Sequence, residues 1–234
     1  MAANEGTGPI FTEDFRRELQ IYINVFTKAV DRITKLLAAA SNVAQVEPET
    51  ADEILRSVIV LTHAYLEDLL RTVATVLLPL ANERMLNDVP LAGLNRTRAE
   101  KFFLGDLAQH KGKTVDEVIH ASVSGYLEHR SFNNTTEIIS FLESLGVSLP
   151  EADKEWIADK ILNWPQGRSP GRKETLARVD EMIRRRHHIV HRADQGPKGL
   201  QPVDREEVEI WRNATYVLMI NVTKACLAKR HVRG

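Results

Sequence analysis

Apolar residues recur every three or four positions over two long stretches of this chain, and this spacing limits the fold more than any other feature. The period is that of an α-helix that buries one face. It predicts one helix from Thr12 to about Ala40 and another over about 51–79. Thr50 and Glu53 have the spacing of a capping box at the start of the second helix. Helices of this length can form the framework of a bundle.

Several further helices are expected downstream, separated by turn residues. The predicted ranges are about 97–110, Thr114 (in a capping box with Glu117) to about His129, a cap at Thr135 or Thr136 to a stop at Gly146, Pro150 to about Trp164, about 172–193, and a cap at Asp204 to about Ala228. No stretch has the alternation of a strand, so the fold class is all-α. We expect residues 1–234 to form a single domain, a bundle of four long helices with a helical insertion at about 90–165.

Composition excludes several classes of protein. Apolar residues make up 43% of the chain, enough for a sizeable core. The net charge is −1, so any contact with nucleic acid has to come from a local basic patch. The first residues lack the basic and apolar regions of a signal peptide, so we expect none, and no apolar run reaches the roughly 18 residues that a membrane span requires. A lone cysteine, Cys226, suits a reducing compartment, so we expect a cytoplasmic protein without membrane contact.

Three arginines and three histidines fall within residues 184–191. Histidine exchanges protons near neutral pH. Arginine is a permanent cation whose planar fork of donors suits phosphate. The two residue types at this spacing are a minimal set for cutting a phosphodiester without a metal.

A helical wheel, at about 100° per residue, separates the members of this run. Arg186 falls in the middle of the apolar arc, where an unpaired guanidinium is very costly. It therefore needs a carboxylate, a phosphate or a cleft. His191 points about 140° away from Arg186 on the same wheel. Either Arg186 curls along the surface, or the last turn unwinds toward Gly196, or the active groups come from two chains.

Glu67, on the predicted second helix, is the candidate partner for this run. It lies on the flank of the apolar stripe, between Val60 and Ala74, whereas Asp68 points nearly opposite. We expect Glu67 to approach Arg186 or to orient a histidine. An ordinary surface carboxylate is the alternative.

The segment Arg186–His191 resembles the motif of the HEPN superfamily, a group of small α-helical domains. In this motif four to six residues separate an arginine from a histidine, and the first of these residues is polar. The stretches AYLEDLLR and SFNNTTEIISFLESLGV look like the branch called RiboL-PSP-HEPN. The resemblance covers about residues 50–230. Arg184 and Arg185 offer longer spacings to His191, but His187 fits the position after Arg186.

This resemblance implies metal-independent cleavage of RNA that leaves a 2′,3′-cyclic phosphate and a 5′-hydroxyl, without any cofactor. It implies His191 as general acid or base, Arg186 for charge in the transition state, His187 as an assisting group and Glu67 as an orienting one. It also implies a homodimer with a composite active site, a toxin or antiphage-defence role, and an antitoxin or defence partner protein. The rest of the run is expected to contact RNA: Arg184, Arg185, His188 and Arg192.

Three alternatives stay open. His187 and His191 have the i, i+4 spacing of helix-borne metal ligands, but the neighbouring cations would repel a metal. A second alternative is a module that binds RNA or protein without cutting. A third is a solvated helix face or a localisation patch, against which the position of Arg186 argues.

Overall fold

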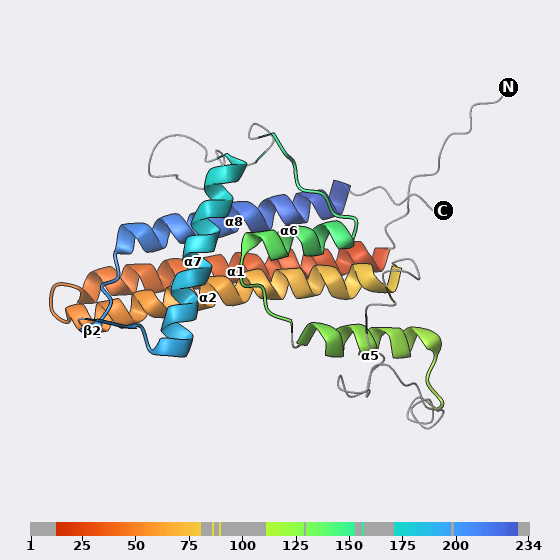
Figure 1. Cartoon of the computed structure of the whole chain (residues 1–234), viewed down its shortest axis with the longest axis horizontal. Helices are drawn as coiled ribbons and strands as arrows, with labels where there is room; N and C mark the ends of the chain where they lie inside the picture. The colour runs from red at the N-terminus through yellow and green to blue at the C-terminus, as the bar shows by residue number, and fades with distance from the viewer. Residues whose placement is uncertain are drawn as a thin grey trace.

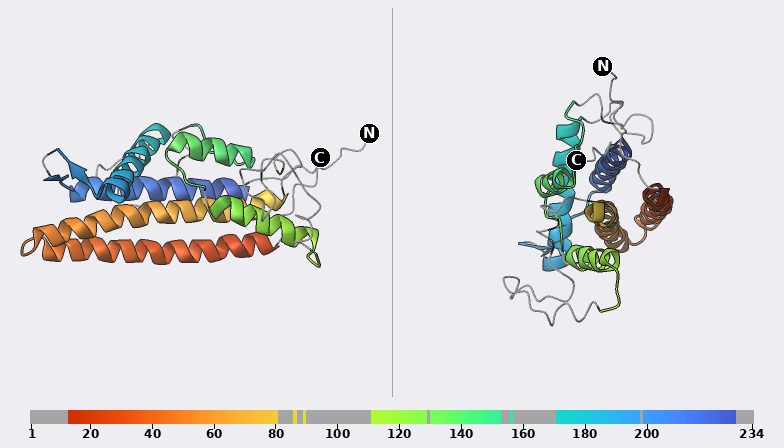
Figure 2. Two further views of the ribbon diagram at one scale, coloured as in Figure 1. Left: turned by 60° about the horizontal axis from the view of Figure 1, so that its bottom comes forward. Right: turned by 90° about the vertical axis from the view of Figure 1, so that its right-hand side faces the viewer.

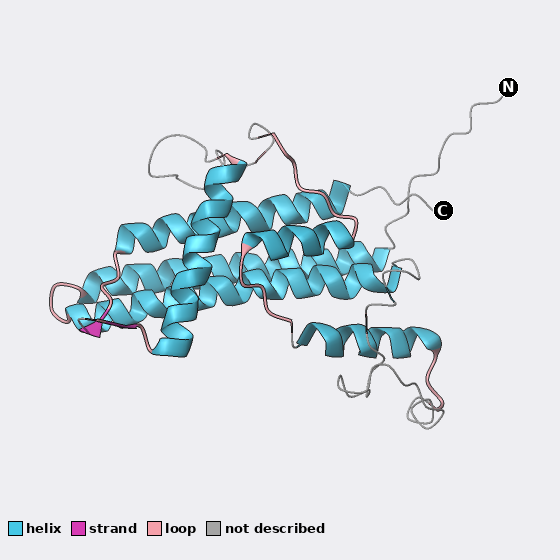
Figure 3. Cartoon of the chain, viewed as in Figure 1, coloured by secondary structure: helices cyan, strands magenta, loops and turns pink. Residues whose placement is uncertain are grey.

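The computed structural model describes residues 13–80, 86, 89, 111–128, 130–152, 156, 171–197 and 199–228. Four long helices dominate this part of the chain: α1 (Glu13–Val43), α2 (Pro48–Leu77), α7 (Arg172–Arg192) and α8 (Arg205–Ala228). The shorter elements are the 3-10 turn η1 (Leu78–Leu80), α5 (Val115–Glu128), α6 (Thr135–Ser144) and two strands of two residues each, β1 (Gln195–Gly196) and β2 (Gly199–Leu200). Figure 3 shows how small the strand content is, and the predicted all-α class is confirmed.

The helix α7 runs across the other long helices. The helices α1 and α2 form an antiparallel pair, and α8 lies alongside them (Figure 1). Seen end-on, these three point along one direction while α7 is seen lengthwise (Figure 2). Because α7 contacts both α2 and α8, it covers one side of the layer that they form.

One shared apolar core joins the long helices. The fully buried aliphatic side chains lie along one face of each helix, at the spacing that the sequence predicts. Examples are Ile33 and Leu37 on α1, Ile59, Leu66 and Leu70 on α2, Met182 on α7, and Val217 and Leu218 on α8. Burying each such side chain stabilises the fold by about 1.5–3 kcal/mol. None of the helices in the described ranges combines the length and apolarity needed to cross a membrane.

Two of the predicted helix starts are confirmed by their caps. The Thr114 amide donates to the Glu117 carboxylate at 2.7 Å, and the Glu117 amide donates back to the Thr114 hydroxyl at 3.3 Å. The Asp204 carboxylate accepts from the Glu206 amide at 3.0 Å, just before α8. Gly146 follows α6 with a φ of +69°, which suits glycine after a helix.

Two other predicted caps are wrong. The helix α2 begins at Pro48, whose fixed φ suits the first helical turn, so Thr50 lies inside the helix and its hydroxyl donates to Glu47. The cap of α6 is Asn134, whose side-chain oxygen accepts from the Glu137 amide at 2.8 Å. An asparagine precedes the two threonines and takes the capping role first.

Three other predicted segments either differ in the structure or lie outside the described residues. Pro150 does not begin a helix, because residues 150–152 and Trp156 are not helical, and the Trp156 indole donates to the Pro150 carbonyl at 2.8 Å. The predicted helix at about 97–110 lies outside the described residues, as do residues 157–164. The strands β1 and β2 occupy a segment expected to be a loop.

Candidate active site

A cavity of about 300 Å³ lies where α7 crosses α2, and we call it the α2–α7 cavity. Its third wall is the segment 130–134, which connects α5 to α6. The cavity gathers most of the titratable residues that the sequence marked, together with one that it did not. The lining residues are His63, Glu67, Ser131, Phe132, Asn133, Ile183, Arg184, Arg186, His187 and His188.

The 130–134 segment is fixed to α2 by a row of polar side chains spaced one helical turn apart. Arg71 donates to the Arg130 carbonyl at 3.2 Å, and the Phe132 amide donates to Glu67 at 3.5 Å. The ring of His63 lies 3.4 Å from the Phe132 carbonyl, through Nε2. One face of α2 therefore carries both the wall of the cavity and two of its ionisable groups.

The same segment is also held to α7. The amide of Thr135 donates to Asp180 at 2.6 Å, and its hydroxyl donates to the other carboxylate oxygen at 2.9 Å. The carboxylate provides a partner for a free amide at the start of α6, and its negative charge interacts favourably with the positive end of the helix dipole. The cavity is thus a fixed feature of three packed elements.

Arg186 lies in this cavity, half-buried, as its place on the apolar arc predicts. Its Nε is buried and has no hydrogen-bond partner in the described part of the chain. Neither is Glu67 within ion-pair distance of it there. A buried donor without a partner is costly, so this guanidinium is suited to a bound anion such as phosphate.

The rings of His187 and His191 lie against each other, tilted by 44°, on the exposed side of α7. Their ring centroids are 4.5 Å apart. His187 also lines the cavity, whereas His191 is exposed and is not among the lining residues. The helix continues through Arg192, so the last turn does not unwind. Arg186 and His191 of one chain therefore do not share the cavity, and His187 lies between them.

The pKa of His187 is lowered. Loss of hydration is the first cause, followed by the charges of His191, His188, Arg186 and Arg192. This direction favours the neutral imidazole at pH 7 and leaves it able to accept a proton.

Glu67 is buried and is not an ordinary surface carboxylate. Its contacts are all long: 3.5 Å to the Phe132 amide, 3.6 Å to Arg71 and 3.8 Å to His63 Nδ1. It shares the cavity with Arg186 and His187, but in the described part of the chain it forms a hydrogen bond with neither. Its nearest imidazole is that of His63.

His63 is the cavity residue that the sequence analysis did not select. It is 2% exposed and reaches the cavity from α2. The signal available in the sequence was its i, i+4 spacing to Glu67, which places both side chains on one face of a helix. That spacing gains meaning only when α7 is known to cross at the same point.

The predicted RNA-contacting residues divide into three groups. Arg184 and His188 line the cavity, and His188 Nδ1 is buried without a partner among the described residues. Arg192 is exposed and lies outside the cavity lining. Arg185 points elsewhere, into a network around Asp194.

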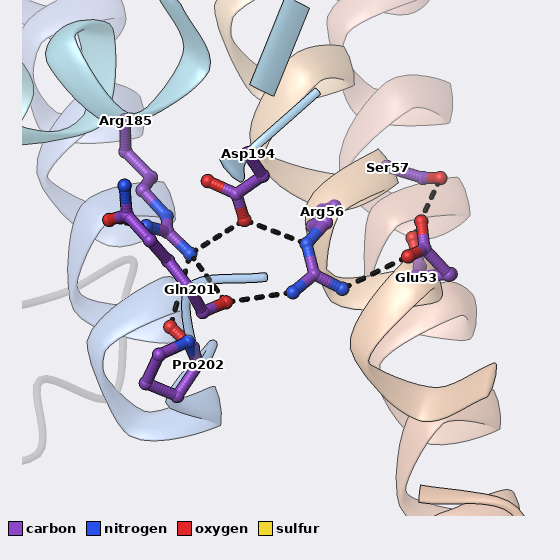
Figure 4. A network of polar contacts seen from close by, with 7 residues as sticks. All are labelled: Glu53, Arg56, Ser57, Arg185, Asp194, Gln201 and Pro202. Carbon is purple, nitrogen blue, oxygen red and sulfur yellow. Dashed lines mark hydrogen bonds and ion pairs between the residues drawn. The ribbon is translucent and has the colours of Figure 1, made fainter. Parts of the chain in front are cut away.

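Asp194 holds Arg185 and Arg56 at the end of α7 (Figure 4). Its Oδ2 accepts from Arg56 Nε at 2.7 Å and from Arg185 Nη2 at 2.8 Å. Arg185 also donates to the Gln201 side chain and to the carbonyls of Gln201 and Pro202. These bonds occupy the Arg185 guanidinium, so it stabilises the fold and is turned away from the cavity.

Ala193 and Asp194 both have a positive φ, 47° and 57°. Their amides both donate to the His188 carbonyl, which ends α7 sharply. Left-handed backbone is unfavourable for alanine and is tolerated better by aspartate. The buried ion pairs of Asp194 keep the chain in this conformation.

No group of three or more histidine, cysteine, aspartate or glutamate side chains suited to a metal ion occurs in the ranges that the structure describes. The neighbouring rings of His187 and His191 therefore have no acidic third ligand beside them among the described residues.

Comparison with known families finds a match over most of the chain. The model of the family described as RiboL-PSP-HEPN matches residues 24–228. Comparison with curated proteins finds no match, and comparison with solved structures finds none either. The match extends the predicted resemblance at its N-terminal side, into α1, and it includes α2, α7 and the cavity between them. The chain therefore belongs to the RiboL-PSP-HEPN family.

Proposed function

We propose that this protein is a metal-independent endoribonuclease that cleaves RNA by attack of a ribose 2′-hydroxyl. Membership of a HEPN family suggests an RNA-related function, since the superfamily includes nucleases. The observation that carries the proposal is the position of Arg186 in a cavity that it shares with three histidines. The buried Nε of Arg186 has no hydrogen-bond partner among the described residues. Such a donor is suited to a phosphate oxygen.

The chemistry assigns a role to each group. An imidazole removes the proton of the 2′-hydroxyl, and the 2′-oxygen attacks the adjacent phosphorus. The bond from phosphorus to the 5′-oxygen breaks, and a second histidine, in its imidazolium form, protonates that oxygen as it leaves. Arg186 stabilises the charge on the phosphoryl oxygens in the transition state. His191 is the proposed proton-transfer residue, and His187 assists it. Arg184, His188 and Arg192 are proposed to contact flanking phosphates.

The position of His191 supports a composite site in a homodimer. His191 lies outside the cavity that holds Arg186 in its own chain. Val190, which directly precedes His191, is 46% exposed, and an apolar side chain beside the motif histidine suits contact with a second copy. Such contact would let His191 of one copy reach the cavity of the other. DNA, which lacks the 2′-hydroxyl, would resist.

The biological role proposed from the family resemblance is that of a toxin or antiphage-defence effector in the cytoplasm. An enzyme that cuts RNA there would need restraint, so a partner protein such as an antitoxin is part of the proposal. The exposed pair His187 and His191 is the surface that such a partner would cover.

Incubation with total RNA in excess chelator tests the proposal. The wild-type protein should cut RNA, while R186A and H191A should each lose roughly 100-fold or more in rate and still retain part of their RNA binding. R178A is the matched control on α7, because Arg178 pairs with Glu181 and does not line the cavity. Binding without any cleavage by the wild-type protein would overturn the proposal and identify a binding module. Cleavage abolished by chelator would identify a metal enzyme.

A further inference from the structure

His63 is a buried imidazole at the candidate site for which the mechanism above has no separate role. It belongs to α2, outside the motif on α7, and lies in the same cavity as Arg186 and His187. Its ring is 2% exposed, so a group that meets it has to enter the cavity.

The hydrogen bonding of His63 fixes which nitrogen is available. Nε2 lies 3.4 Å from the Phe132 carbonyl, which can only accept, so Nε2 carries the proton. Nδ1 of the neutral ring is then an acceptor. It is buried, and no described residue gives it a hydrogen bond. Its neighbour Glu67 Oε2, 3.8 Å away, is a carboxylate oxygen and has no proton to offer when ionised.

Burial is the main reason that His63 stays neutral. Its pKa is lowered, first by burial and then by Arg186 and Arg71, while Glu67 and the Phe132 carbonyl oppose the shift. The other charged or titratable side chains of the cavity are Arg184, His187 and His188 on α7. The cavity face of the 130–134 segment is formed by Ser131, Phe132 and Asn133, which do not titrate. At pH 7 the ring is therefore neutral and able to accept a proton.

Among the described residues, the cavity thus offers an acceptor on His63 and a donor on Arg186 that have no hydrogen-bond partner. A ribose with its 3′-phosphate presents the matching pair, a hydroxyl that donates and phosphate oxygens that accept. We propose that His63 is a further catalytic residue, the general base that takes the proton of the 2′-hydroxyl, an inference that rests on the proposed ribonuclease function.

The step balances without any other reactant. The proton passes from the 2′-oxygen to His63 Nδ1, the bond between that oxygen and phosphorus forms, and the bond from phosphorus to the 5′-oxygen breaks. The leaving oxygen takes its proton from the imidazolium of His191. The new positive charge on His63 lies 3.8 Å from the Glu67 carboxylate, which stabilises it.

The variant H63Q separates this role from a structural one. The glutamine amide can donate to the Phe132 carbonyl, as Nε2 does, but cannot act as a base. We expect the rate of RNA cleavage to fall by roughly 100- to 10,000-fold, with RNA binding and thermal midpoint close to wild type. The wild-type rate should fall as the pH drops through the lowered pKa of His63, and H63Q should lose this acidic limb. The control H120Q, on exposed α5, should match the wild type.

A cleavage rate for H63Q within about threefold of wild type, with an unchanged pH profile, would overturn the role of His63. R186A would still abolish cleavage in that case, so the ribonuclease proposal would stand. If H63Q lowers the thermal midpoint, H63A is assayed with added imidazole. A rate that rises with imidazole concentration supports the role, whereas no rescue overturns it.

Discussion

Asp194 explains how a helix with three consecutive arginines ends against the core of the protein. Its carboxylate is 1% exposed and is shared by Arg56 and Arg185, whose side chains are 6% and 12% exposed. Loss of that anion would leave Arg185 without an ion pair among the described residues and Arg56 with only the exposed Glu53. The residue is thus central to stability, although it follows the motif by only three positions.

The substitution D194N keeps the shape of the side chain and removes its charge. We expect the free energy of unfolding to fall by about 3–5 kcal/mol, because the poorly hydrated Arg185 loses its anion and Arg56 keeps only its ion pair with the exposed Glu53. Urea unfolding monitored by circular dichroism measures this change. The control is D31N, which breaks the exposed ion pair of Asp31 with Lys35 and should change the free energy by at most about 1 kcal/mol. A loss as small in D194N as in D31N would contradict this role of Asp194.

At the scale of elements, the long helices could be predicted from the sequence because each repeats an apolar pattern over many turns. The exact starts of the helices were harder to predict. The helix α2 begins at Pro48, ahead of the predicted cap at Thr50, and Asn134 caps α6 in place of Thr135 or Thr136. Local spacing cannot rank two competing caps a residue or two apart.

The crossing of α7 over α2 could not be read from spacing, because it depends on side chains far apart in the sequence. His63 and Phe132 are 69 residues apart, and Thr135 and Asp180 are 45 apart. The wheel placed Arg186 on the apolar side of its helix, and the structure places both Arg186 and Glu67 in the lining of the cavity. His63 was missed because its meaning depends on the docked 130–134 segment.

For the whole molecule, the central question is whether one copy holds a complete site. Arg186 is inside the α2–α7 cavity and His191 is outside it. HEPN family membership and the exposed Val190 both favour a dimer in which each copy completes the cavity of the other.

Mixing two inactive variants tests this arrangement. In a mixed dimer of R186A and H191A, one cavity has the intact Arg186 of one copy and the intact His191 of the other. We expect equal amounts, allowed to exchange subunits, to recover about a quarter of the wild-type rate. Each variant alone, at the same total concentration, should stay inactive. A mixture that remains inactive, although mass spectrometry detects mixed dimers, would place both groups in one chain.

The chemistry of the cut itself is most directly measured on a short RNA oligonucleotide in excess chelator, beside the same oligonucleotide with a single 2′-deoxyribose on the 5′ side of the mapped scissile bond. We expect the all-ribose strand to yield a 2′,3′-cyclic phosphate and a 5′-hydroxyl, identified by mass spectrometry. We expect the substituted strand to stay intact at that bond. Cleavage of both strands, or products with a 3′-hydroxyl and a 5′-phosphate, would contradict attack by the 2′-hydroxyl at the α2–α7 cavity.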